Sequence, residues 1–311
     1  MRKENKNLEF KEKISKSYLK TISAYSNYDG GKIIFGIDDN RKVIGLEKIT
    51  DIKLNIENTI NDSIKPKPDY TLEIEKIEDK NCIILSIQRG NFPPYYYNGK
   101  AYKRNDTSTV EVDRVELNRL ILQGSNLDYE EVEIENTDLK FKFLEKKLKE
   151  TIDIKELNLD ILKTLNLYKN KKFNIAAELF ADNNRRNFSG IDIIVFGENI
   201  NKILFKENIE KKSILEQYFE TISIFEKYYE YEEIVGFERI KKEKISKKAF
   251  REALANAIVH RIWDINSNIK IVMSNDKIEI ISPGSLPQGI SENEYMKGYI
   301  SILRNPIISN I

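Results

Sequence analysis

Cysteine, histidine and net charge are all scarce in this chain of 311 residues. The single Cys82 and the single His260 exclude a disulfide framework and a Cys/His zinc site, because structural zinc needs four such ligands. No apolar run approaches the roughly 18 residues that cross a bilayer, and residues 1–20 contain no signal-peptide core. We therefore expect no membrane span and a location in the cytoplasm.

The charges nearly cancel, with 51 Lys and Arg against 50 Asp and Glu, for a formal net charge of +1. Any affinity for nucleic acid must therefore come from a local basic face. The 40% hydrophobic content is too high for a disordered chain and is sufficient for two domains with cores of their own.

The first part of the chain reads as an α+β domain over residues 1–125. Apolar residues at three- and four-residue steps predict helices, and alternating or continuous β-branched runs predict strands. The expected helices cover residues 14–28, 50–64 and 113–122, and the expected strands cover residues 32–37, 43–46, 70–74 and 82–87. Asn98-Gly99, flanked by aromatic residues, carries the strongest hairpin signal in the chain.

An acidic stretch follows this domain. Residues 128–138 contain six acids and no base, which is typical of an exposed connector, so we assign residues 126–137 to an acidic linker. Residues 138–311 form the second part. Helices are expected there at residues 138–150, 156–168, 213–229 and 247–260, and strands at residues 191–196, 268–274 and 277–282.

Basic residues concentrate at two places in the first domain. Residues 1–20 carry seven Lys or Arg against three Glu, and Lys100, Lys103 and Arg104 follow the tyrosine-rich hairpin. Such cations make most phosphate contacts, and neighbouring aromatic rings stack on unpaired bases. The alternative interpretation is a solvated helix face beside tyrosines that only pack.

Two polar clusters are further candidates. Glu4, Glu9, Asp38 and Asp39 would hold a divalent cation for phosphodiester hydrolysis if they met in space, whereas acids near helix starts usually complement the helix dipole. In the second part, Glu252, Asn256 and His260 are four residues apart and share one helix face, which favours a ligand site or a polar network.

The first domain resembles a known family. The segments LEFKE (8–12), SAYSNYDGGKIIFGIDD (23–39), VIGL (43–46) and AYKRNDTST (101–109) are similar to the Schlafen/AlbA-type DNA-binding domain. The resemblance implies a mixed-sheet α+β fold and nucleic acid as the partner. In eukaryotic relatives with RNase activity, the matching acids are Glu4, Glu9 and Asp39.

The second part resembles a GHKL-like ATPase module found in predicted bacterial transcriptional regulators. The similar segments are ILEQYFETISIF (214–225), FREALANAIVHR (250–261), ISPGSLPQGI (281–290) and RNPIISNI (304–311). This resemblance implies a truncated Bergerat-like α/β sandwich that binds ATP. Glu252 would polarise the attacking water, Asn256 would bind Mg²⁺ on the phosphates, and Gly284 would lie in the adjoining turn.

Departures from the ATPase pattern weaken this expectation. Ser282 stands where the family has an Asp or Asn that grips adenine, and the sequence ends at Ile311, before the family's phosphate lid. We therefore expect a degenerate or incomplete ATP-binding module, with ATP and Mg²⁺ as the only cofactors, and no hydrolysis by this chain.

The favoured hypothesis is a nucleic-acid-binding protein, a DNA-binding transcriptional regulator that is compatible with a homodimer. Its phosphate contacts are expected at Lys11, Lys100, Lys103 and Arg104. The alternative is a metal-dependent nuclease that acts on RNA or single strands through Glu4, Glu9 and Asp39.

Overall fold

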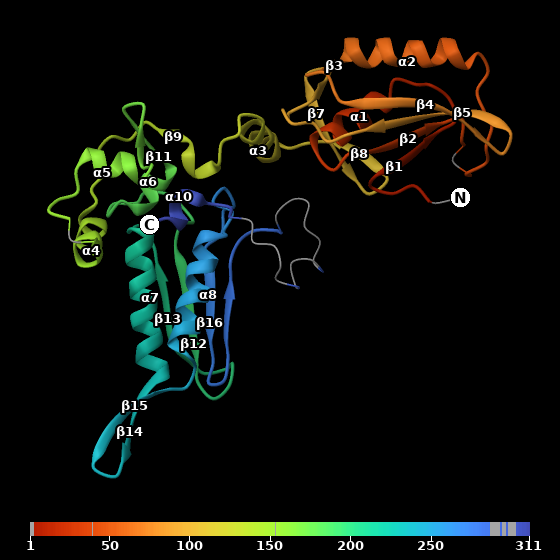
Figure 1. The fold of residues 1–311 in the computed structure, drawn as a ribbon. Coiled ribbons are helices and arrows are strands. Elements are labelled where there is room, and N and C mark those ends of the chain that lie inside the picture. The colour runs from red at the N-terminus through yellow and green to blue at the C-terminus, as the bar shows by residue number, and fades with distance from the viewer. Residues whose placement is uncertain (1–2, 39, 153, 287–292, 294–296, 298–302) are drawn as a thin grey trace. The chain divides into compact units, whose positions relative to one another are not determined.

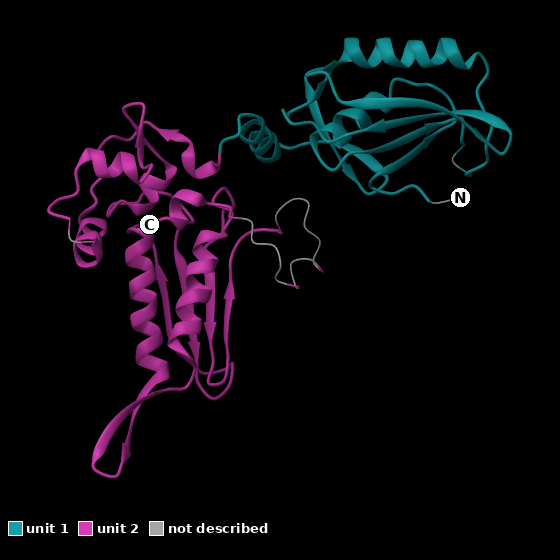
Figure 2. Cartoon of the chain, in the orientation of Figure 1, with its two compact units in different colours: residues 1–127 teal, residues 128–311 magenta. Residues whose placement is uncertain are grey.

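The chain folds into two compact units, residues 1–127 and 128–311, and each has its own hydrophobic core (Figure 2). The computed structural model describes residues 3–38, 40–152, 154–286, 293, 297 and 303–311. Both units combine helices with mixed or antiparallel sheets, so the expected α+β class with mixed sheets is confirmed. None of the helices within these described ranges is long and apolar enough to cross a membrane.

Two four-stranded sheets form the first unit (Figure 1). In sheet order, the first contains β1 (Leu8–Lys11), β2 (Gly31–Phe35), β5 (Lys80–Ile87) and β4 (Tyr70–Ile77). The second contains β3 (Ile64–Lys65), β6 (Tyr96–Tyr97), β7 (Lys100–Asn105) and β8 (Ser108–Glu111). Strand β1 pairs in parallel with β2, whereas the other pairings are antiparallel.

The helices of this unit are α1 (Tyr18–Asn27), α2 (Ile49–Ser63) and α3 (Arg114–Gly124). Helix α1 is almost wholly buried and contacts strands of both sheets, so it forms the centre of the unit's core. It ends at Asn27, shortly before a glycine pair in which Gly30 has a φ of +73° and a side chain on Gly31 would collide with the ring of Tyr25. The predicted Asn98-Gly99 hairpin turn is present, with φ values of 50° and 73°.

One expected strand of the first unit is wrong. Residues 43–46 form no strand and keep only an isolated bridge between Ile37 and Val43. The backbone of Gly36 and Gly45 has positive φ, which takes this stretch out of the extended conformation. Val43 is nevertheless buried with Phe10, Ile37 and Cys82, so packing rather than strand pairing explains its apolar character.

The second unit is built on a mixed sheet with strand order β13 (Ile203–Ile209), β12 (Ile191–Phe196), β16 (Ile269–Met273) and β17 (Ile278–Ile281). Helices α7 (Ile214–Tyr229) and α8 (Lys247–Val259) lie over this sheet and share its core (Figure 1). A small sheet contains β9 (Glu133–Ile134), β10 (Tyr168–Lys169) and β11 (Lys172–Asn174). The remaining elements are η1 (Tyr129–Glu131), α4 (Lys142–Ile152), α5 (Leu159–Thr164), α6 (Ile175–Phe180), the hairpin β14 (Glu230–Val235) and β15 (Glu238–Glu243), and α10 (Pro306–Ser309).

Helix α5 is shorter than the expected helix over residues 156–168. The side chain of Asn158 accepts hydrogen bonds from the amides of Asp160 and Ile161 and so caps the start of the helix. Asn166, with a φ of 56°, ends the helical path. Both residues favour caps and turns, which is the physical reason for the shorter helix.

The expected acidic linker is wrong as an exposed segment, because its first residues belong to the second unit. Glu130 is fully buried, and its carboxylate accepts hydrogen bonds from the amides of Ile307 at 2.6 Å and Ile308 at 2.9 Å. Burial raises the pKa of Glu130 to about 7, against the pull of these two bonds. The acid here is a cap for the start of α10.

Candidate nucleic-acid interface

Strand alternation decides where the acid and the lysine of β1 lie. Leu8 and Phe10 pack on the outer face of the sheet with Ile37 and Cys82. Glu9 pairs in register with Ile33 and Lys11 with Phe35, and both of these partners belong to the main core of the unit. Glu9 is thus a charged residue on the core-facing side of an edge strand, and it is only 4% exposed.

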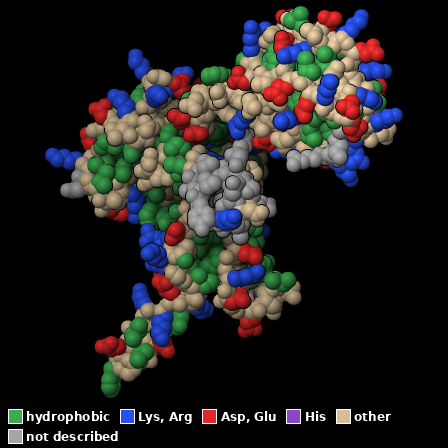
Figure 3. All heavy atoms as spheres, turned by 45° about the vertical axis from the view of Figure 1, so that its right-hand side comes forward, with side chains coloured by type: hydrophobic (Ala, Val, Ile, Leu, Met, Phe, Trp, Pro, Cys, Tyr) green, Lys and Arg blue, Asp and Glu red, His purple; other side chains and the backbone are tan. Residues whose placement is uncertain are grey.

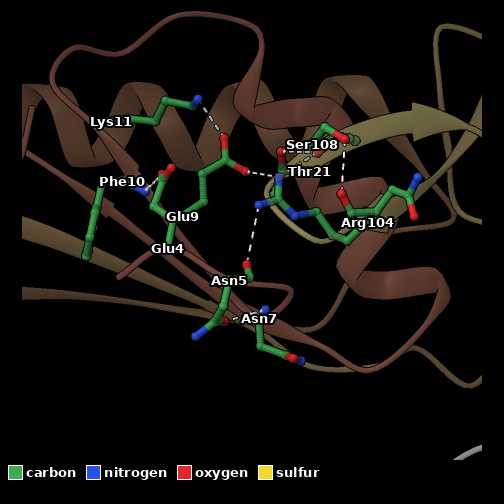
Figure 4. Close-up of polar contacts among 11 residues, drawn as sticks. Glu4, Asn5, Asn7, Glu9, Phe10, Lys11, Thr21, Arg104 and Ser108 are labelled. Carbon is green, nitrogen blue, oxygen red and sulfur yellow. Dashed lines mark hydrogen bonds and ion pairs between the residues drawn. The ribbon is translucent and has the colours of Figure 1, made fainter. Parts of the chain in front are cut away.

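The buried charge of Glu9 is neutralised by two cations (Figure 4). Its Oε1 contacts Nζ of Lys11 at 2.6 Å, and its Oε2 accepts a hydrogen bond from Nη1 of Arg104 at 2.7 Å. The same Arg104 nitrogen also donates to Oγ1 of Thr109 at 2.9 Å, and its guanidinium lies over the ring of Tyr25. Buried charges need such partners, so this ion-pair cluster fixes β1 against β7.

Alternation along β7 separates the predicted phosphate contacts. Lys100, Tyr102 and Arg104 share one face, whereas Lys103 lies on the opposite face. There, Nζ of Lys103 contacts Glu116 of α3 at 2.7 Å. On the first face, Nζ of Lys20 from α1 lies 5.8 Å from the centre of the Tyr102 ring. We call Lys11, Lys20, Lys100 and Arg104 the basic face.

The side chains of the basic face differ in exposure, and this decides which of them can contact a ligand. The side chain of Arg104 is 4% exposed, that of Lys11 is 29% exposed and that of Lys100 is 53% exposed. Lys20 is exposed, and Lys100 pairs with Glu111 at 2.7 Å. A surface pair of this kind is weak and exchanges readily for a phosphate. The lysines can therefore meet a ligand, whereas Arg104 orients Glu9 and does not reach the surface.

Two of the predicted nuclease acids, Glu4 and Glu9, have protein partners in the structure. Oε1 of Glu4 accepts the amide hydrogen of Phe10 at 2.7 Å, and both oxygens of Glu9 already hold cations. Asp39 lies outside the described residues. Among the residues that the structure describes, no group of three His, Cys, Asp or Glu side chains is placed to hold a metal ion. A divalent cation site at Glu4, Glu9 and Asp39 therefore stays a prediction, and it would require Glu9 to exchange its two cationic partners for the metal.

The predicted nucleotide-binding residues lie on α8 and in the turn after β17. Glu252 and Asn256 are both exposed, one helical turn apart. Gly284 follows Ser282, whose hydroxyl donates to the carbonyl oxygen of Ala257 at 2.6 Å and so holds this turn against α8. Glu252 lines a cavity of about 470 Å³ whose lining does not include Asn256 or the described part of the turn.

Sequence reasoning missed some members of the basic-face network. Lys20 was only one of several N-terminal lysines, and nothing in the sequence indicated that its ammonium would lie over Tyr102. Thr109 closes the segment AYKRNDTST (101–109), and the resemblance of this segment to the Schlafen/AlbA-type domain was the available signal for its bond to Arg104. Thr21 of α1, 3.0 Å from the Thr109 hydroxyl, had no signal at all.

Each of the two units contains a region that matches a known protein family. The Schlafen, AlbA_2 family model matches residues 4–113, and the model described as "Putative ATP-dependent DNA helicase recG C-terminal" matches residues 266–311. An uncharacterized ATP-binding protein of Ureaplasma parvum is 27% identical over a region that covers 38% of this chain and 42% of that protein.

A solved structure extends the likeness to almost the whole chain. The crystal structure of the DIP2311 protein from Corynebacterium diphtheriae superimposes with a TM-score of 0.51 and 19% identity, covering 98% of this chain and 66% of that one. This likeness shows a shared fold. The chain spans less than half of the Ureaplasma relative and about two thirds of the solved chain. Residues 4–113 of this chain are thus similar to the Schlafen, AlbA_2 family, and residues 266–311 are similar to the recG C-terminal model.

Proposed function

We propose that the first unit binds nucleic acid through the basic face. The observation that carries this proposal is that three lysines gather at one face of β7. Lys100 lies on that face, Lys20 lies over the ring of Tyr102, and Lys11 of β1 is joined to the face through Glu9 and Arg104. With a net charge of only +1 on the chain, such a local face is what a polyanion would recognise. The Schlafen AlbA_2 match over residues 4–113 supports the same function.

Burial of three tyrosines in and beside the β6–β7 hairpin favours duplex over single-stranded ligands. Tyr95, Tyr97 and Tyr102 are at most 8% exposed, so their rings pack in the core and are not free to stack on unpaired bases. Phosphate contacts by lysine then dominate the affinity, and these contacts fix orientation without reading sequence. A DNA-binding regulator in the cytoplasm, with Lys11 and Lys100 as contacts and Arg104 as a positioning residue, is the finer proposal.

Fluorescence anisotropy over a salt series tests the basic face. Wild-type protein should bind duplex DNA with an affinity that falls steeply with salt, because each neutralised phosphate releases counterions. Each of the single substitutions Lys11→Ala, Lys20→Ala and Lys100→Ala should make the plot of log affinity against log salt less steep by about 0.9. Lys103→Ala is the matched control, since its lysine lies on the opposite face of β7 and pairs with Glu116.

Two results would contradict this proposal. One is an equal loss of affinity in Lys103→Ala and in Lys20→Ala, because the face of β7 would then be irrelevant. The other is the absence of binding to DNA or RNA at low salt, which is what a protein-interaction scaffold would show. If the protein bound single strands more tightly than duplex, the proposed role of the basic face would stand and the proposed preference for duplex would be wrong.

For the second unit, we propose a nucleotide-binding module with weak affinity. Glu252 and Asn256 lie one turn apart on the exposed side of α8, and Ser282 holds the Gly284 turn beside the same helix. Asn256 would hold Mg²⁺, which supplies charge neutralisation on phosphates when it is bound. The name of the Ureaplasma relative and the recG C-terminal match support a nucleotide as the ligand.

A further inference from the structure

Residues 304–308 hold three parts of the second unit together through hydrogen bonds. We call this segment the strap, and it consists of Arg304, Asn305 and the first three residues of α10. Helix α10 contacts both η1 and α8 and lies beside the end of α8 in Figure 1. The strap bonds to the end of α8, to the turn after β17 and to a buried acid of η1, which are far apart in the sequence.

Asn305 caps the end of α8. It is 3% exposed, and its Nδ2 donates hydrogen bonds to the carbonyl oxygens of Val259 at 2.6 Å and Arg261 at 2.9 Å. The last carbonyl groups of a helix have no partner within the helix. One side-chain amide thus satisfies two carbonyl groups, one on each side of His260. This fixes the path of the chain where α8 ends.

Arg304 joins the same helix end to the turn that contains Gly284. Its Nη1 donates to the carbonyl oxygen of His260 at 3.1 Å, and its Nη2 donates to that of Ser285 at 2.9 Å. The hydroxyl of Ser282 bonds the start of the same turn to α8. The turn is therefore held to the helix on both sides of Gly284.

Glu130 holds the other end of the strap. It is fully buried, and its two carboxylate oxygens accept the amide hydrogens of Ile307 and Ile308. These amides open α10, where N–H groups have no partner within the helix. Glu130 precedes Ile307 by 177 residues in the chain. The position of Asn305, two residues before Ile307, is thus set by an acid at the start of the second unit.

The strap adjoins the residues proposed to bind a nucleotide. Asn256 lies in the last turn of α8, and Gly284 lies in the turn that Arg304 holds. Acidic and basic side chains are interspersed on the face of the second unit that Figure 3 shows. A field of one sign is then not what retains an anionic ligand, and the placement of a few groups decides its affinity. Such groups need supporting residues that fix their positions.

We propose that Asn305 and Arg304 are positioning residues of the nucleotide site, and that Glu130 sets their position through α10. This role rests on the function proposed for the second unit, because it names the residues that keep Asn256 and the Gly284 turn in place. Asn305 spends its donors on two carbonyl groups, so it acts through α8 and not on the ligand. Glu130 is fully buried and acts only through the strap.

Nuclear magnetic resonance of ATP, titrated with the full chain in the presence of Mg²⁺, measures weak affinities and gives the first test. Asn305→Ala should raise the dissociation constant of ATP about tenfold, as loss of a supporting residue typically does. Glu130→Gln should raise it severalfold, because glutamine keeps one acceptor oxygen and turns an NH₂ group toward the other amide. All variants are compared well below their unfolding temperatures.

Asn174→Ala is the matched control. Asn174 is 7% exposed in the same unit, and its side chain also makes two hydrogen bonds, one to the carbonyl oxygen of Asn166 and one from the amide of Ala177. It caps α6 and makes no contact with the strap. Its loss should lower stability in the same way as loss of Asn305 and leave the affinity for ATP unchanged.

The fluorescence of Trp263 tests the strap without a nucleotide. Trp263 is the single tryptophan, is 6% exposed, and lies 4.4 Å from the guanidinium of Arg261, whose carbonyl group Asn305 holds. Asn305→Ala and Glu130→Gln should both shift its emission to longer wavelength as water reaches the ring. Asn174→Ala should leave the emission unchanged.

Four outcomes would overturn the proposal. If wild type and Asn305→Ala bind ATP equally well, the strap does not position the site, although the nucleotide function stands. If Asn174→Ala weakens binding as much as Asn305→Ala, the loss is one of general stability. Unchanged affinity and emission in Glu130→Gln would show that α10 transmits nothing. If wild type itself binds no ATP at millimolar concentration, the nucleotide function is wrong, and the positioning role is wrong with it.

Discussion

Glu9→Gln is the substitution that probes the candidate interface most directly. The change removes one charge and keeps the shape of the side chain. Arg104 would then keep its guanidinium buried, at 4% exposure, with an amide oxygen in place of a carboxylate. Its Nε has no hydrogen-bond partner in the structure, and its other two acceptors, Oγ1 of Thr109 and the carbonyl oxygen of Asn5, carry no charge that could replace the carboxylate.

The expected cost follows from this burial. Breaking a buried ion pair by removing one partner typically costs about 3–5 kcal/mol, because the remaining charge is left uncompensated. The glutamine still accepts one hydrogen bond, so we expect the lower end, about 3 kcal/mol of unfolding free energy. For a unit of 127 residues this corresponds to a fall in Tm of roughly 10 °C.

The single Trp263 makes the assay specific to one unit. It lies in the second unit, so its fluorescence reports the unfolding of residues 128–311 and provides an internal reference. Circular dichroism during urea unfolding should show an earlier transition for Glu9→Gln, while the Trp263 transition stays in place. Glu12→Gln is the matched control, since its pair with Lys13 is exposed and spans 3.5 Å, which is worth at most about 1 kcal/mol.

Equal stability of the Glu9→Gln and Glu12→Gln variants would refute this reasoning. That outcome would mean that water reaches Arg104 and screens it as at the surface. A shift of the Trp263 transition to lower urea concentration, together with that seen by circular dichroism, would also contradict the reasoning, because the effect would then not be local to the first unit.

The remaining predictions concern three other groups. Calorimetry with ATP and Mg²⁺ should give weak or undetectable heat, and micromolar binding that Asn256→Ala abolishes would show that the module is functional. Because burial raises the pKa of Glu130 from 4.5 to about 7, its contribution to stability is full below about pH 4.5 and is lost as the pH rises through 7. This loss amounts to roughly 3 kcal/mol of unfolding free energy. Glu130→Gln should remove this part of the pH dependence of thermal unfolding. An unchanged dependence of Tm on pH in the variant would contradict the assignment to Glu130. In the nuclease assay with Mg²⁺ or Mn²⁺, we expect binding without cleavage, and cleavage of RNA that Glu4→Gln abolishes would establish the alternative function.

Local patterns in the sequence predicted the helices and central strands well. The four-residue spacing of apolar residues in α2 and the continuous apolar run of β5 each have one physical interpretation, burial of a helix face and a strand buried at the centre of a sheet. The Asn98-Gly99 turn was equally clear, because few residue pairs accept two positive φ values. These features depend on residues close together in the chain.

Contacts between distant segments could not be predicted from the sequence alone. Glu130 reads as one acid among six, and only the fold brings the amides of Ile307 and Ile308 to its carboxylate. The opposite placement of Lys103 and Arg104 follows from strand alternation, but which face of β7 meets α1 is a tertiary fact. The sequence therefore indicated the segment that carries the candidate interface and could not rank its cations.

The position of Glu9 also separates the two candidate functions of the first unit. As a counter-ion between Lys11 and Arg104, it lowers the positive charge of the basic face, so Glu9→Gln should bind duplex DNA as tightly as wild type or more tightly, at temperatures below its transition. As a metal ligand, it would be required for cleavage, and the same substitution would remove activity without raising affinity. Both of its oxygens already hold cations at 2.6 and 2.7 Å, so a metal ion would have to displace Lys11 and Arg104. The geometry therefore favours the binding function, and the Glu9→Gln variant, assayed for both affinity and cleavage, discriminates between the two.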